Sequence, residues 1–368
     1  MHSWTRQERI DYLRQRGLPE LHRHFDGSIR PQTLWNLSEK YYTAIPGMKY
    51  EGFVKMLSWD REHDRSLLDY LDKFHVPLQY TQFYDNVRRI AFEICEDAYL
   101  DGIRLLELRI NPVIHRRAGL SNRQVLNAVR AGTKLAREKY PDLRTGLIVI
   151  AIRGHGGNMA KILLREVVGE LAVFHDSPGV VGFDIAGAER PFPPILFKDA
   201  YALARKMGMR LTAHAGEDTG PENVWQALDE LGVDRVGHGT SSARDKSLLR
   251  RLAADGVTLE VALSSNMQTG AVASLKEHPL RVFLDAGVRV TLATDNPTVS
   301  ATTLTEEYLL AIEEFGLTRE EIDALIENGF AASFLGGEPK APERPSPGAG
   351  EPAGLPVRGG GNGGSSRS

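Results

Sequence analysis

Short apolar segments alternate with helical patterns along most of this chain, and this alternation constrains the fold more than any other feature. Eight segments, several of them rich in Val and Ile, are typical of buried strands: residues 18–24, 103–110, 145–153, 180–185, 210–214, 235–238, 258–263 and 288–294. Helical spacing occurs between them at residues 86–99, 122–138, 198–207, 221–231, 246–255 and 278–286. Eight strands alternating with helices predict a (β/α)8 barrel.

The alternative to a barrel is an open, doubly wound sheet, which shows the same alternation of strands and helices. No glycine-rich phosphate loop follows the first predicted strand, so the barrel is favoured. Residues 41–79 are long for a connection between a strand and the helix that follows it. We expect this segment to form a helical insertion over the C-terminal face of the barrel.

Residues 336–368 differ in composition from the rest of the chain. They are rich in Gly, Pro and Ser and contain few large apolar side chains. Such a segment cannot bury enough apolar surface to offset the entropy lost on ordering, so we expect it to be disordered. The sequence therefore predicts one barrel domain over residues 1–335, followed by a disordered tail.

Charge and composition narrow the possible partners. Lys and Arg number 45 against 48 Asp and Glu, which leaves no strong positive field for holding a nucleic acid. The N-terminal segment lacks an apolar signal region, and no run approaches the roughly 18 apolar residues of a membrane span. A single cysteine, Cys95, fits a reducing compartment. We expect a cytoplasmic protein that acts on a small molecule.

Reactive side chains occur where the predicted strands end. In chain order they are His22, His24, Arg153, Asp184, His214, Glu217, His238, Ser264, Ser265, Asn266, Asp295 and Asn296. The C-terminal ends of barrel strands converge on one face, and active sites of such barrels lie there. We therefore expect these side chains to surround a single site, which scattered surface histidines would not do.

A metal ion is the best explanation for the histidines in this set. His22 and His24 are two residues apart on a predicted strand, so their side chains point to the same face. With His214 and Asp295 they would offer three imidazole nitrogens and one carboxylate oxygen, which suits Zn²⁺ with room for a water. Taken singly, each has an ordinary explanation: Asp295, for example, could cap a turn. Their joint placement at strand ends favours the metal site.

At these residues the chain resembles the adenosine deaminase family of the amidohydrolase superfamily. The matching segments lie at residues 20–28, 181–187, 212–217, 235–239, 259–261, 265–270, 278–279 and 294–297. His-Ala-Gly-Glu at 214–217, Gly-His-Gly at 237–239 and Thr-Asp at 294–295 are specific, and the segments follow the family's order from about residue 18 to 335. The resemblance implies a hydrolase with one zinc ion per chain that removes the 6-amino group of a purine nucleoside.

The resemblance also implies a role for individual residues. It implies that the zinc ligands are His22, His24, His214 and Asp295, and that Glu217 shares a proton with purine N1. It implies that His238 orients the attacking hydroxide, accepts a proton and stabilises the developing oxyanion. Three positions would bind the nucleoside: Asp26 at the ribose 5′-hydroxyl, the Gly187 N–H at N3, and residue 296 at N7. Protonation of N1 lets the ring accept electrons during attack at C6, which requires an acid.

Two positions depart from the family pattern. Asn296 stands where a second aspartate is usual, and Ala188 stands where aspartate is common after Gly187. An aspartate must be protonated before it can donate to N7, whereas the amide of Asn296 donates directly. The sequence offers no account of Ala188.

In the predicted insertion, the helically spaced side chains of Leu67, Leu68, Tyr70, Leu71 and Phe74 correspond to the family's apolar lid over the ribose. A helix that simply packs on the barrel would show the same spacing, so both interpretations stay open. If the segment is a lid, its closure would exclude water and strengthen the electrostatic interactions of the site.

Several functions remain compatible with the sequence. The first is deamination of adenosine or 2′-deoxyadenosine to inosine or 2′-deoxyinosine and ammonia. The second is deamination of another 6-aminopurine, such as 6-aminodeoxyfutalosine, methylthioadenosine or adenine. A non-catalytic protein that binds nucleosides or metal is a third. A hydrolase with two metals bridged by a carbamylated lysine is disfavoured, because no lysine ends the fourth or fifth predicted strand.

Overall fold

Eight parallel strands form the centre of the fold in the computed structural model, which describes residues 4–64, 66–171 and 179–336. Each strand pairs with the next in chain order. They are β1 (Leu18–His24), β2 (Ile103–Ile110), β3 (Arg144–Ile152), β4 (Val180–Ala186), β5 (Arg210–Ala215), β6 (Arg235–His238), β7 (Thr258–Val261) and β8 (Arg289–Leu292). A parallel bridge between Arg23 and Asp295 joins β1 to the segment after β8. The predicted (β/α)8 barrel is therefore confirmed.

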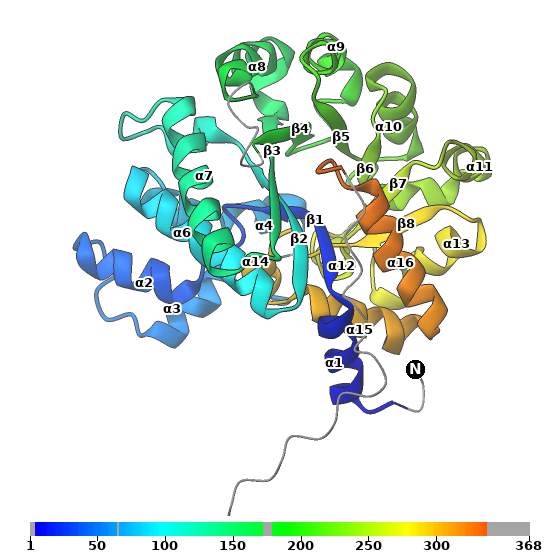
Figure 1. The fold of residues 1–368 in the computed structure, drawn as a ribbon, viewed down its shortest axis with the longest axis horizontal. Coiled ribbons are helices and arrows are strands. Elements are labelled where there is room, and N and C mark those ends of the chain that lie inside the picture. The colour runs from blue at the N-terminus through cyan, green and yellow to red at the C-terminus, as the bar shows by residue number, and fades with distance from the viewer. Residues whose placement is uncertain (1–3, 65, 172–178, 337–368) are drawn as a thin grey trace, which may run out of the picture. The chain divides into compact units, whose positions relative to one another are not determined.

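Helices precede, connect and follow the strands. They are α1 (Arg6–Arg16), α2 (Pro31–Lys40), α3 (Tyr50–Leu57), α4 (Leu67–Asp72), α5 (His75–Tyr80), α6 (Tyr84–Leu100), α7 (Asn122–Lys139), α8 (Gly156–Leu171), α9 (Lys198–Lys206), α10 (Pro221–Gln226), α11 (Lys246–Asp255), α12 (Leu263–Gln268), α13 (Leu280–Asp285), α14 (Pro297–Ser300), α15 (Leu304–Phe315) and α16 (Arg319–Ala332). Helices α6 to α11 lie around the outside of the barrel (Figure 1). The helix predicted at 221–231 is α10 continued by a π-helical turn, Ala227–Leu231.

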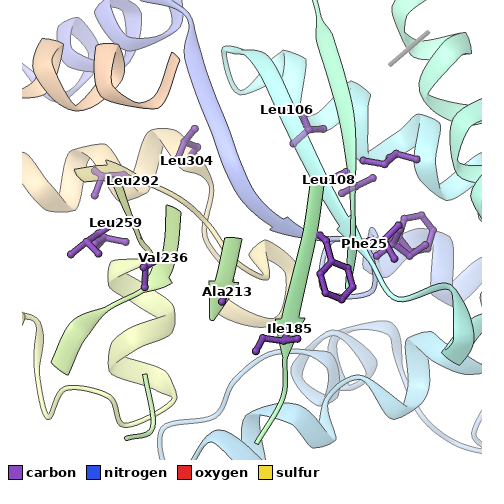
Figure 2. Close-up of a cluster of buried hydrophobic side chains, with 14 of the residues drawn as sticks. Phe25, Leu106, Leu108, Ile185, Ala213, Val236, Leu259, Leu292 and Leu304 are labelled. Carbon is purple, nitrogen blue, oxygen red and sulfur yellow. The ribbon is translucent and has the colours of Figure 1, made fainter. Parts of the chain in front are cut away.

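The apolar core lies between the strands and the helices that surround them. Figure 2 shows part of it, with side chains such as Leu108, Ile185, Val236 and Leu259, all fully buried. Successive residues of a strand point to opposite faces. Because alternate residues of β2 enter this core, its charged residues Glu107 and Arg109 face the barrel interior.

The last two strands end earlier than the sequence predicts. β7 ends at Val261 and α12 begins at Leu263, whereas the apolar run continues to residue 263. β8 ends at Leu292, and Asp295 then adopts a φ of 58°, which a continuing strand does not allow. The residues beyond these strands therefore turn over the end of the barrel, where they can reach a common site.

The long connection after α2 contains α3, α4 and α5. The disordered tail predicted at 336–368 lies outside the described residues from 337 onward. Among the described residues, none of the helices is both long and apolar enough to cross a membrane.

Candidate active site

Three histidines and one aspartate meet at the C-terminal end of the barrel. The Nε2 atom of His22 lies 3.1 Å from that of His214, and the Nε2 atom of His24 lies 3.3 Å and 3.2 Å from these two. Asp295 Oδ1 lies 3.4 Å from His22 Nε2 and 3.2 Å from His24 Nε2. The structure thus brings together the four residues that the sequence predicts as metal ligands.

The donor atoms of this cluster fit a zinc ion. Ligands about 2.0–2.1 Å from a tetrahedral ion lie roughly 3.3 Å from one another, close to the separations seen here. Asp295 Oδ1 is buried and accepts no hydrogen bond within the described structure. A buried carboxylate oxygen without a partner is costly, and a cation at the meeting point of these atoms would satisfy it.

Two buried carboxylates orient two of the three histidines of this cluster, His22 and His214. His22 Nδ1 lies 3.0 Å from Glu260 Oε2, and His214 Nδ1 lies 3.0 Å from Asp184 Oδ2. If both Nδ1 atoms donate a proton to these carboxylates, the Nε2 lone pairs face the cluster, as metal ligation requires. The guanidinium of Arg109 bridges the two carboxylates, with bonds to Asp184 (2.7 Å) and to Glu260.

The charges in this network favour ionised carboxylates and neutral imidazoles. Burial alone would raise the pKa of Asp184, but His214 and Arg109 hold it below its usual value. Burial opposes ionisation of Glu260 in the same way, and Arg109 and Arg235 outweigh it. Burial lowers the pKa of His214 to about 3, so its ring is neutral and able to bind a metal.

Glu217 and His238 face each other beside the cluster. Glu217 Oε2 lies 3.6 Å from His238 Nε2, and both side chains line the same cavity as His24 and Asp295. Burial raises the pKa of Glu217 to about 8, with further contributions from the negative charges of Asp295 and Glu189. Near neutral pH this carboxyl group therefore carries a proton that it can donate.

The backbone around two site residues is strained. His238 has a φ of 62° and Asp295 a φ of 58°, in the left-handed region that residues with a side chain seldom adopt. Both residues directly follow or end strands of the barrel. Hydrogen bonds between Asp295 and β1 hold this conformation: its N–H donates to His22 O (2.9 Å) and its carbonyl accepts from His24 N (2.8 Å). Strain of this kind is typical of functional sites.

The buried carboxylate of Glu189 holds the loop that carries Glu217. Its oxygens accept hydrogen bonds from the backbone N–H groups of Gly216 (2.7 Å), Glu217 (3.1 Å) and Asp218 (3.2 Å), and from the Asn223 amide (3.1 Å). Glu189 is 3% exposed. It therefore fixes the position of Glu217 through the backbone.

The cavity beside the cluster has a volume of about 220 Å³. The three residues predicted to bind a nucleoside, Asp26, Gly187 and Asn296, all line it. Burial raises the pKa of Asp26, although His24 opposes this effect. Asn296 packs directly on Gly27, where any side chain would collide with the amide. Gly27 thus leaves the space that Asn296 occupies.

The insertion forms an apolar wall of this cavity. Leu67, Tyr70 and Leu71 of α4, Leu78 of α5, and Phe74 between the two helices line it. Leu68, which the sequence pattern groups with them, is 64% exposed. The Tyr70 hydroxyl lies 2.7 Å from Ser300 Oγ and ties α4 to α14. Tyr70, Phe74, Leu78 and Val299 form an apolar cluster separate from the main core. The segment therefore borders the site.

The other strand-end residues support the site indirectly. Arg153 donates to the carbonyls of His214 and Phe192, both at 2.5 Å, and Ser265 Oγ donates to Asp295 Oδ2 at 2.6 Å. Sequence reasoning did not assign roles to Arg109, Glu189 or Glu260. The available signal for Arg109 and Glu260 was a charged residue within a predicted buried strand. For Glu189, which lies in a loop, we find no such signal.

Comparisons with known proteins agree with this arrangement. The sequence model of the family described as adenosine deaminase matches residues 18–342. An adenosine deaminase of Clostridium kluyveri is 34% identical over 322 residues, which are 87% of this chain and 90% of that protein.

Solved structures show the same likeness. The adenine deaminase of Arthrobacter aurescens superposes with a TM-score of 0.79 and 25% identity, over 86% of this chain and 93% of that one. An amidohydrolase of Burkholderia ambifaria, solved with bound zinc, has a TM-score of 0.79 and 25% identity over 90% and 89% of the two chains.

Proposed function

The chain belongs to the adenosine deaminase family and is a hydrolytic deaminase, and on that premise we propose that it deaminates adenosine or 2′-deoxyadenosine with zinc at the His22, His24, His214 and Asp295 cluster. One observation carries the proposal. Three imidazole nitrogens and an unpartnered carboxylate oxygen meet beside a cavity that also contains a carboxyl group protonated near neutral pH.

The reaction needs a nucleophile at C6 and an acid at N1 of the purine. Zinc held by the four residues would lower the pKa of a water so that it attacks near neutral pH. Glu217 is placed to give its proton to N1, because burial keeps its carboxyl group protonated. His238 Nε2 faces Glu217 and would contact the oxygen that adds to C6. The proton of the hydroxyl group on the tetrahedral carbon then passes to the 6-amino group, which leaves as ammonia as the C–O bond becomes the carbonyl of a 6-oxopurine.

The lining of the cavity favours a nucleoside over a nucleotide. The described residues around it include the carboxyl groups of Asp26, Glu217 and Asp295, and no lysine or arginine. A 5′-phosphate would meet negative charge without a cation to pair with, whereas a free 5′-hydroxyl could donate to Asp26. The apolar side chains of α4 and α5 would cover the sugar and exclude water.

Another 6-aminopurine is the second candidate, and a specific likeness supports it. The solved structure from Arthrobacter aurescens is an adenine deaminase. For the free base, the part of the cavity next to Asp26 would lack a partner, so we place adenine after adenosine. Methylthioadenosine and 6-aminodeoxyfutalosine would both remove the 5′-hydroxyl that Asp26 is placed to meet.

The test is the ultraviolet spectrum of the zinc-loaded protein with adenosine, 2′-deoxyadenosine, methylthioadenosine, 6-aminodeoxyfutalosine and adenine in parallel. We expect the two unmodified nucleosides to be converted fastest. Faster conversion of any other compound would replace adenosine as the substrate.

A variant tests the acid. Glu217→Gln should bind one zinc per chain and lose turnover by about 10²–10⁴-fold, the usual contribution of a positioned acid. Turnover retained with adenosine would show that another group protonates N1.

A further inference from the structure

We propose that His278 and Asn266 form a hydrogen-bond relay that holds neutral His238 with its proton on Nε2. The nitrogen that faces the cavity would then be a hydrogen-bond donor, with its proton already in place. His278 and Asn266 act through His238 and are therefore positioning residues. The relay follows from the directions of three hydrogen bonds, each of which fixes the next.

The first bond fixes the tautomer of His278. The backbone N–H of Leu280 donates to His278 Nδ1 at 3.1 Å. A backbone N–H can only donate, so Nδ1 must be the unprotonated nitrogen of the ring. In a neutral imidazole the proton then resides on Nε2.

His278 has no room for a second proton. A proton on Nδ1 would point at the N–H of Leu280, and the side chain is 4% exposed, so water cannot take over the bond. Burial also lowers the pKa of His278 to about 3. The ring is therefore neutral under ordinary conditions.

The second and third hydrogen bonds connect His278 to Asn266 and Asn266 to His238, so the tautomer of His278 determines that of His238. His278 Nε2 lies 3.1 Å from Asn266 Oδ1, and its proton makes it the donor. The amide of Asn266 is thereby oriented with Nδ2 toward His238 Nδ1, at 2.8 Å. An amide N–H only donates, so His238 Nδ1 accepts and its proton resides on Nε2. The opposite direction would require a proton on His278 Nδ1, against the N–H of Leu280.

The surroundings of His238 Nε2, on the cavity side of the ring, are consistent with a hydrogen-bond donor whose acceptor would be a bound ligand. Its Nε2 atom is buried, has no hydrogen-bond partner within the described structure, and lies 3.6 Å from Glu217 Oε2. This step rests on the proposed function: the oxygen that adds to C6 would be the acceptor. The relay thus favours His238 as a donor to the developing oxyanion, rather than as the base that takes a proton from water on Nε2.

Long-range ¹H–¹⁵N correlation NMR of the zinc-loaded protein, labelled with ¹⁵N-histidine, tests the relay directly. The signals of His238 are assigned by their loss in His238→Gln. We expect Nδ1 of His238 to resonate as an unprotonated nitrogen and Nε2 as a protonated one. The reverse pattern, or two protonated nitrogens, would overturn the proposal. His115 is buried elsewhere beside Thr81 and provides an internal reference.

A variant that reverses the last bond gives a second test. In Asn266→Asp, the carboxylate can only accept, so it should draw a proton onto His238 Nδ1 while still accepting from His278. We expect the Nδ1 signal of His238 to shift to the protonated range and the His115 signals to stay in place. An unchanged His238 spectrum in the folded variant would contradict the relay. If the variant fails to fold, the wild-type spectrum still decides.

Activity and tautomer are measured separately, so the two proposals can fail independently. A His238 proton on Nε2 without turnover of adenosine would leave the relay intact and reject the proposed substrate. Turnover of adenosine with the His238 proton on Nδ1 would support the proposed substrate and reject the relay.

Discussion

His22 Nδ1 lies 3.0 Å from Glu260 Oε2 inside the barrel, and the side chains of both residues are 0% exposed. Glu260 comes from β7 and His22 from β1, and β8 lies between these two strands in the barrel. The carboxylate can therefore set the ring orientation of a histidine to which it is not adjacent in the sheet. If zinc binds at the cluster as proposed, this contact makes the affinity for zinc depend on a residue that would not touch the metal.

Glu260→Gln should weaken zinc binding about 10- to 100-fold, the usual effect of losing a carboxylate that orients a metal-binding histidine. The measurement is a titration against a competing chelator. Glu107→Gln is the matched control, because Glu107 is also buried and bonded to Arg235 but makes no contact with a cluster histidine. Both variants should be less stable, and only the first should lose zinc affinity. Equal affinity in the two would show that Glu260 does not orient His22.

The pH dependence of turnover should report Glu217. Burial raises the pKa of this carboxyl group to about 8, so the proton needed at N1 is present below that pH and is lost above it. With the zinc-loaded enzyme at saturating adenosine, kcat should fall as the pH rises past the pKa of Glu217. Zinc nearby would favour the ionised form and move the fall to lower pH. A kcat that instead rises with pH across this range would require Glu217 to act only as a base.

Glu189→Gln should lower kcat on the order of 10- to 100-fold, because small displacements of a catalytic group have effects of that size. The glutamine would turn an NH₂ group toward backbone N–H groups that now donate to a carboxylate. Zinc content should be unchanged.

The control for Glu189 is Glu222→Gln in the first turn of α10, just after the loop that carries Glu217; its exposed carboxylate accepts only from Gly220 N–H among the described hydrogen bonds. Its kcat should match that of the wild type. If both variants lose activity equally, the loop as a whole is sensitive and Glu189 has no special role.

The residues at strand ends could be predicted from the sequence because two simple geometric rules place them. A His-x-His pair on a strand must share a face, and the ends of parallel barrel strands must converge. His22, His24, His214 and Asp295 accordingly lie together in the structure. The barrel could be predicted for the same reason, since eight alternating units leave few other topologies.

The contacts that orient these residues could not be predicted in the same way. Arg109 bridges Asp184 and Glu260 across the barrel interior, and which charged side chains meet there depends on the register of strands far apart in sequence. The π-helical turn after α10 and the early end of β7 also depend on packing. Periodicity indicates which face a side chain takes, but not which partner it meets.

Tyr70→Phe should raise KM for adenosine about 2- to 10-fold, because it removes one buried hydrogen bond worth roughly 0.5–1.5 kcal/mol. That bond, from the Tyr70 hydroxyl to Ser300 Oγ at 2.7 Å, ties α4 to the segment after Asn296. The ring stays, so the apolar wall of the cavity is kept. Leu68→Ala on the same helix is the control, since Leu68 is 64% exposed and should leave KM unchanged. An unchanged KM in Tyr70→Phe would show that the tie does not affect binding.

Asn296→Asp should make kcat/KM for adenosine fall with rising pH by more than the loss of the Glu217 proton causes in the native enzyme, because the native amide does not titrate. A carboxyl group at this position can donate to purine N7 only while protonated, and ionised it would repel the lone pair of N7. Losing the bond at high pH should cost about 10- to 100-fold, equivalent to roughly 1.5–3 kcal/mol.

7-Deazaadenosine provides the matched substrate for this variant, because it lacks the N7 acceptor and is otherwise adenosine. If Asn296 meets N7, the substitution should affect adenosine strongly and the 7-deaza compound little, and the difference isolates that single contact. Asn296 packs on Gly27 in the native chain, and aspartate has nearly the same shape, so the backbone should not need to move. An equal loss with both substrates would mean that the new charge beside Asp295 disturbs the metal cluster, and that Asn296 does not read N7.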